Sequence, residues 1–100
     1  MSTSRFSAEL HAELVLSLEA YADLHGAPRE RERLDAAADS VCREAHARGM
    51  RPEAMVVAVH AAYEAISPVL HDVGALRSAY DRLVSGCIRA YFEAVAKPTS

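Results

Sequence analysis

Several residue types are scarce in this chain, and each scarcity removes a class of protein. The 100 residues include no tryptophan, two cysteines, four glycines and four prolines. The two thiols, Cys42 and Cys87, form no CxxC pair and do not build a disulfide scaffold, so a reducing compartment is expected. No apolar run is long enough to span a membrane, and the first residues lack the apolar stretch of a signal peptide. We therefore expect a cytoplasmic protein with no membrane partner.

An excess of charge of one sign is also missing. The 11 basic and 14 acidic residues are mixed along the chain and give a net charge of −3. Such a surface builds no field that attracts phosphates, so nucleic acid is disfavoured as a partner. What is abundant favours helices, because 51% of the residues are apolar and alanine, leucine, glutamate and arginine dominate. The composition predicts an all-α domain that folds around its own core.

The spacing of the apolar residues predicts four helices. They recur three or four positions apart, which is the period of one helix face. We expect helices at residues 7–25, 28–48, 52–66 and 75–96. Gly49 followed by Pro52 gives a stop and a start signal, whereas residues 67–74 fit either a loop or a kinked helix. The short turns predict a four-helix bundle-like single domain over residues 1–100, with mostly antiparallel neighbouring helices.

The third predicted helix is apolar over most of its circumference. A helix needs an apolar stripe only about 100° wide to face a core, so the excess needs cover from neighbouring helices or from a second chain. The leading hypothesis is therefore a protein-interaction or self-association module, a homodimer that uses the third and fourth helices and is not an enzyme. The residues expected in the core or the interface are Met55, Val56, Val59, Tyr63, Tyr91 and Phe92.

The segment around residues 45–60 resembles the turn of DNA-binding helix-turn-helix proteins. Ala45 is followed four residues later by Gly49 and then by a hydrophobic residue. The resemblance implies a DNA-binding regulator whose reading helix, from Arg51 onward, needs exposed basic or amide side chains near its start. The positions expected to be exposed on that helix are Glu53, Val57, His60 and Glu64. These side chains offer few base-reading donors and repel phosphate, so the regulator stays the alternative hypothesis.

Weak signals point to a third class, a small-ligand or metal-binding bundle. Cys42 and His46 lie four positions apart, as do His60 and Glu64, so each pair shares a helix face from which it can ligate a metal. Such pairs also arise by chance among five histidines and 14 acidic residues, and no HExxH motif accompanies them. Aromatic residues at helical spacing fit a ligand cavity but are ordinarily core. We expect no catalytic residue, metal or cofactor.

Two further resemblances involve the same region. His46, which is followed by Arg48 and Gly49, is similar to the phosphorylated histidine of helical-bundle phosphotransfer domains. That family carries its motif inside a continuous helix, whereas Gly49 comes one residue early and ends the predicted helix. Residues 47–59 also resemble segments of short bacterial helical proteins, and that resemblance implies no activity.

Overall fold

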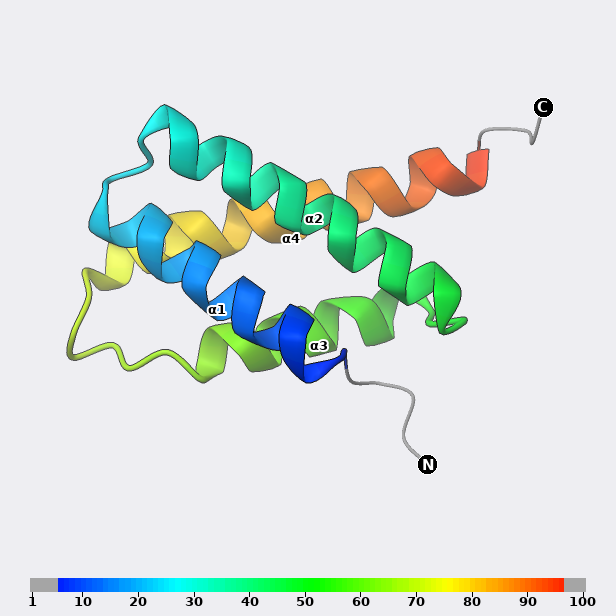
Figure 1. Ribbon diagram of the computed structural model, residues 1–100, viewed down its shortest axis with the longest axis horizontal. Coiled ribbons are helices and arrows are strands. Elements are labelled where there is room, and N and C mark those ends of the chain that lie inside the picture. Colours follow the sequence, from blue (N-terminus) through cyan, green and yellow to red (C-terminus); the bar gives the residue numbers. More distant parts are fainter. Residues whose placement is uncertain (1–5, 97–100) are drawn as a thin grey trace.

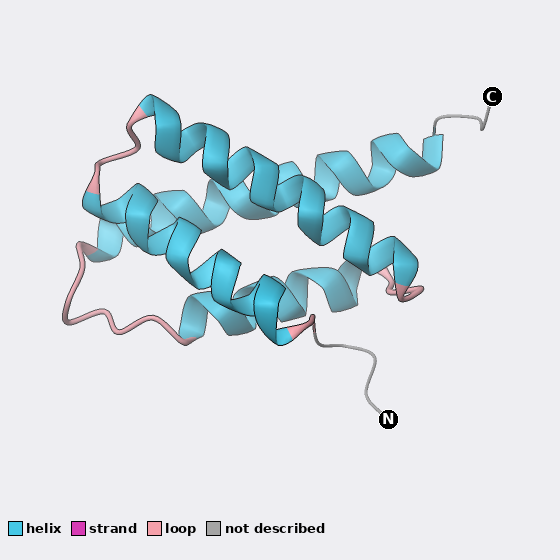
Figure 2. Ribbon diagram, in the orientation of Figure 1, coloured by secondary structure: helices cyan, strands magenta, loops and turns pink. Residues whose placement is uncertain are grey.

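The computed structural model describes residues 6–96 and has an all-α architecture, as predicted. Its helices are α1 (Ala8–Asp23), α2 (Pro28–Ala47), α3 (Pro52–Glu64) and α4 (Val73–Ala96). Successive helices run in opposite directions along the long axis of the molecule (Figure 1). Figure 2 shows that only loops and turns join them, and the described residues contain no strand. The prediction of a four-helix bundle-like fold is confirmed.

Local signals set several of the helix ends. The Ser7 hydroxyl caps α1 by accepting a hydrogen bond of 3.2 Å from the backbone N–H of Leu10. Gly49 adopts a φ of +66°, a conformation in which a side chain would clash with the backbone. Met50 then folds back onto the end of α2, where it is buried and donates its N–H to the carbonyl of Ala45 at 2.8 Å. The predicted glycine stop at this position is confirmed.

The connection between α3 and α4 resolves the alternative left open for residues 67–74. α3 ends two residues earlier than predicted, and α4 begins two residues earlier, at Val73. Asp72 precedes α4, and its carboxylate accepts a hydrogen bond of 3.1 Å from the backbone N–H of Ala75. This segment is therefore a loop that ends in a helix cap, and not a kinked helix.

The core lies between all four helices. Its most deeply buried large apolar side chains are Leu14, Leu18, Leu34, Val41, Met55, Val59, Leu83 and Cys87. The most extensive packing joins α2 to α4, which run in the same direction although they are not consecutive in the chain. Small residues permit this approach, because a Cβ added at Gly86 would lie 3.1 Å from the Cβ of Ala38.

Neighbouring helices, one of the two kinds of cover expected for the third helix, enclose most of its apolar surface. Met55 and Val59 are fully buried inside one chain, so their role is in the core. Val56 and Tyr63 are half-buried, and Val57, at 62%, is the one large apolar side chain that α3 leaves exposed. α3 packs against α1 and α4 and, less extensively, against α2. Across residues 6–96, no helix combines the length and apolar character needed to cross a bilayer.

Candidate functional site

The longest helix, α4, presents an apolar row to the outside of the bundle. We define the apolar row as Tyr80, Val84, Ile88 and Phe92, which are four positions apart and form one ridge. Tyr80 and Val84 are half-buried against the core, whereas Ile88 is 39% and Phe92 53% exposed. Val95, beyond the row, is 63% exposed. Exposure rises toward the carboxyl end, where the last turns of α4 project past the start of α3 (Figure 1).

Two contacts with α2 hold α4 so that the apolar row faces outward. Gly86 lies against Ala38, and the Arg82 guanidinium donates two hydrogen bonds, of 3.1 and 3.0 Å, to the two carboxylate oxygens of Asp35. A bidentate pair of this kind fixes direction as well as distance. Gly86 and Arg82 lie on the other side of α4 from the apolar row, because 100° separates successive residues of a helix. The row is therefore turned away from α2.

An aromatic cluster of His60, Tyr63 and Tyr80 joins α3 to α4. The two tyrosine rings lie 4.6 Å apart, and the Tyr80 hydroxyl lies 3.2 Å from Nδ1 of His60. Nε2 of His60 lies 3.4 Å from a carboxylate oxygen of Glu64. Burial raises the pKa of Tyr80, so its phenol stays protonated at neutral pH. The cluster is a structural link and supplies no activated nucleophile.

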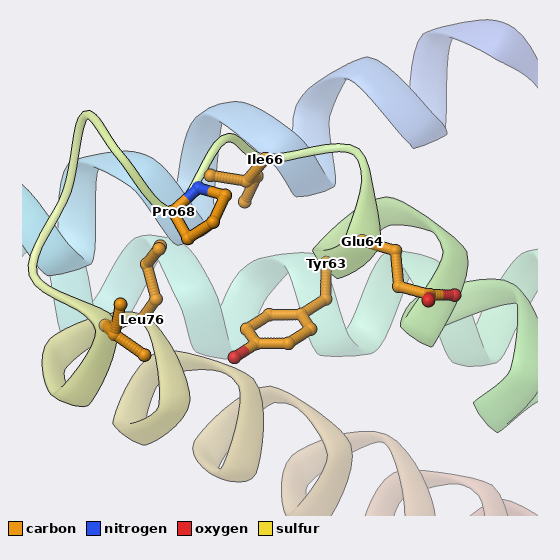
Figure 3. A pocket seen from close by; sticks show the side chains of 6 residues that line it. Tyr63, Glu64, Ile66, Pro68 and Leu76 are labelled. Atoms are coloured by element: carbon orange, nitrogen blue, oxygen red, sulfur yellow. The ribbon is translucent and has the colours of Figure 1, made fainter.

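A shallow depression lies beside this cluster, at the loop between α3 and α4 (Figure 3). Its volume is about 280 Å³, and it is lined by Tyr63, Glu64, Ile66, Pro68, Val73 and Leu76. Ligand pockets usually enclose roughly 300–1,000 Å³ and converge several polar groups on the ligand. Here the carboxylate of Glu64 points away from the Tyr63 ring. The depression suits an apolar side chain better than a polar substrate.

The carboxyl end of α4 is anchored by one aromatic residue and leaves the next one exposed. The Tyr91 hydroxyl donates a hydrogen bond of 2.9 Å to the backbone carbonyl of Met50, and its ring stacks on His46 with centroids 4.3 Å apart. Phe92 meets the Tyr91 ring edge to face at 5.5 Å but is otherwise open to solvent. Tyr91 therefore ties α4 to the turn between α2 and α3, and Phe92 stays exposed.

These positions separate the roles of the residues predicted as core or interface. Among those outside the core, Val56, Tyr63 and Tyr91 are half-buried within the chain, and Phe92 alone is exposed. Ile88 and Val95, which are exposed on α4, are not among the residues predicted for the core or the interface. Their spacing from Phe92, four and three positions, was the signal that could have found them.

The four weak metal candidates do not form one site. Cys42 is buried on α2, and burial raises the pKa of its thiol, whereas His46 is exposed on the same helix. His60 belongs to the aromatic cluster, and its Nε2 lies 3.4 Å from the carboxylate of Glu64 on the same helix. Within residues 6–96, no three histidine, cysteine or acidic side chains are grouped to hold a metal ion. Cys87 is also a free, buried thiol, and burial raises its pKa to about 12, so it is an inert core residue.

His71 with its partners Asp23 and Glu19 forms what we call the histidine clamp, which the sequence prediction missed. It lies at the end of the bundle where the loop between α3 and α4 meets α1. Nδ1 of His71 lies 2.7 Å from a carboxylate oxygen of Asp23, and Nε2 lies 3.1 Å from one of Glu19. The hydrogen bond to Asp23, with the two negative charges, raises the pKa of His71, so the charged imidazole donates from both nitrogens. Its partners are 48 and 52 positions away, and no local pattern signals such a contact. The clamp holds the loop between α3 and α4 against α1.

The resemblances to helix-turn-helix proteins and to phosphotransfer domains, both near Gly49, gain no support from the geometry. α3 exposes the acidic side chains of Glu53 and Glu64, as expected, on the surface that would have to face DNA. His46 lies in the last turn of α2 and not within a continuous helix. In comparisons with known proteins, no family model, curated protein or solved structure matches this chain.

Proposed function

We propose that this protein works through protein contacts, as a homodimer that pairs through the outward face of α4. The observation that carries the proposal is the exposure of three large apolar side chains along one helix, Ile88, Phe92 and Val95. Single apolar residues are ordinary on a surface, but a contiguous group of them marks an interaction site. A second copy can cover this group with the same group, because a two-fold dimer uses one patch on both chains.

The exposed side chains supply useful binding energy. Burying a whole phenylalanine side chain contributes about 1.5–3 kcal/mol, so burying the exposed half of Phe92 contributes about 1 kcal/mol. Two-fold symmetry counts each residue twice, which gives about 2 kcal/mol for this position. A charge placed there would also have to lose its hydration in the interface. Replacing Phe92 by aspartate should therefore raise the dissociation constant at least about thirtyfold.

Size-exclusion chromatography with light scattering tests the proposal over a range of micromolar concentrations. We expect the native chain to have the mass of a dimer and Phe92→Asp to have the mass of a monomer with unchanged helix content. The matched control is Leu16→Asp on α1, because Leu16 is 54% exposed but lies on another helix. It should remain dimeric. A native chain that stays monomeric throughout, or a control that dissociates as readily as Phe92→Asp, would contradict the proposal.

A cytoplasmic location is part of the same proposal. It is supported by the two buried cysteines, which are free thiols in a fold that needs no disulfide. Fractionation of cells that produce the tagged chain should recover it with cytoplasmic markers. Recovery in a membrane or secreted fraction would count against this location without bearing on the dimer.

A further inference from the structure

A second ridge runs along α4 beside the apolar row and carries an ordered pattern of charge. We define the charged row as the five exposed residues Arg77, Asp81, Ser85, Arg89 and Glu93, which are also four positions apart. Its charges read positive, negative, neutral, positive and negative along the helix. When this order is reversed about Ser85, every positive charge falls on a negative one. The row is therefore complementary to itself in the antiparallel direction.

The charged side chains of this row make few contacts within one chain. Arg77 and Asp81 approach to 3.8 Å, and their side chains are 73% and 66% exposed. In the described part of the chain, the side chains of Arg89 and Glu93 make no ion pair or hydrogen bond. Exposed charges of this kind do not destabilise a monomer. Their order along the helix restricts the direction in which a second copy can pack against them.

We propose that a second copy of this chain docks its α4 antiparallel to the first, about a two-fold axis beside Ser85. Asp81 then faces the partner's Arg89, and the symmetry repeats this pair, whereas Arg77 and Glu93 lie farther around the helix from the contact. This inference rests on the proposed function, self-association through α4, and adds its direction and register.

The register follows from helix geometry. With a rise of 1.5 Å per residue, Asp81 and Arg89 lie about 6 Å on either side of Ser85, and Arg77 and Glu93 lie about 12 Å away. Equal distances from the axis bring each residue level with its counterpart of opposite sign. The small side chain of Ser85 lets the two helices approach closely at the axis. A parallel pairing in the same register would set each charge against its own kind.

The apolar rows fit the same axis. The two-fold operation places both rows on the same side of the paired helices, where their members interleave along the axis. Val84 of each chain lies next to the axis, and Ile88 falls at a level between Val84 and Tyr80 of the other chain. Phe92 lies one step farther out, beyond the partner's Tyr80. One register therefore pairs Asp81 with the partner's Arg89 and covers the exposed side chains of the apolar row.

A complementary charge exchange tests the direction and register. In a dimer of Arg89→Glu, the new carboxylate of each chain faces the partner's Asp81. In a dimer of Asp81→Arg, the new guanidinium of each chain faces the partner's Arg89. Each variant by itself should dimerise about tenfold to thirtyfold more weakly than the native chain at low salt. An equimolar mixture should form a heterodimer of near-native affinity, because each mixed pair again joins opposite charges. Native mass spectrometry or sedimentation of size-tagged chains measures both quantities.

Arg31→Glu is the matched control, because Arg31 is exposed on α2 and its replacement changes the net charge by the same amount as Arg89→Glu. It should dimerise like the native chain. Restored affinity in the mixture also shows that both variants are folded. If the native chain dimerises but the mixture is no tighter than the single variants, the antiparallel register is wrong and self-association stands. If the native chain does not dimerise, both the register and the proposed function fail.

Discussion

The close packing of α4 against α2 makes a sharp prediction about Gly86. A Cβ added there would lie 3.1 Å from the Cβ of Ala38, below the 3.5–4.0 Å at which carbon atoms attract each other best. That Cβ is fixed to the backbone of α2, so relief requires a helix to shift. In Gly86→Ala, the helix propensity gain of about 1 kcal/mol is set against an overpacking cost of about 1–3 kcal/mol. We expect a net loss of about 0–2 kcal/mol.

A double-mutant cycle with Ala38→Gly separates the two terms. Removing the methyl group of Ala38 costs about 1 kcal/mol in helix propensity and about 0.8 kcal/mol in burial, but it opens the space that the new methyl at position 86 needs. The double variant should therefore be about 1–3 kcal/mol more stable than the sum of the single changes predicts. Denaturant unfolding followed by circular dichroism gives all three free energies. A coupling energy indistinguishable from zero would refute the proposed contact between α2 and α4.

Two other predictions concern the ends of the bundle. Tyr91→Phe removes the hydrogen bond to the Met50 carbonyl and should lower the free energy of unfolding by about 1 kcal/mol, seen as a fall of roughly 4–8 °C in Tm; an unchanged Tm would show that the bond contributes nothing. The hydrogen bond to Asp23 and the nearby Glu19 raise the pKa of His71 above its ordinary value of 6.5. The charged imidazole should therefore stabilise the fold fully below pH 6.5, and this stabilisation should be lost as the pH rises through the raised pKa. The Tm difference between the native chain and His71→Gln, measured against pH, checks this, and a difference that grows toward alkaline pH would contradict the clamp.

Local patterns predicted the helices well, because the interactions that set them are local. Backbone hydrogen bonds span four residues, and a cap such as Asp72 or a stop such as Gly49 acts within one turn. α3 ends two residues before its predicted end, although Ile66 keeps the apolar spacing and is buried, and α4 begins two residues before its predicted start, at Val73. The periodicity of apolar residues does not distinguish a buried helical turn from a partly exposed connection.

The sequence by itself determined the all-α class, the number of helices and the set of side chains with apolar faces. Tertiary structure alone decided which of those faces meet the core. Val59 and Ile88 look alike as apolar residues at helical spacing, yet Val59 is fully buried and Ile88 lies at the surface. The contacts of His71 with α1 and of Arg82 with Asp35 were equally invisible, since they join residues 47 to 52 positions apart. Such contacts depend on how the helices are placed in space, and the spacing of residues within one helix carries no information about that placement.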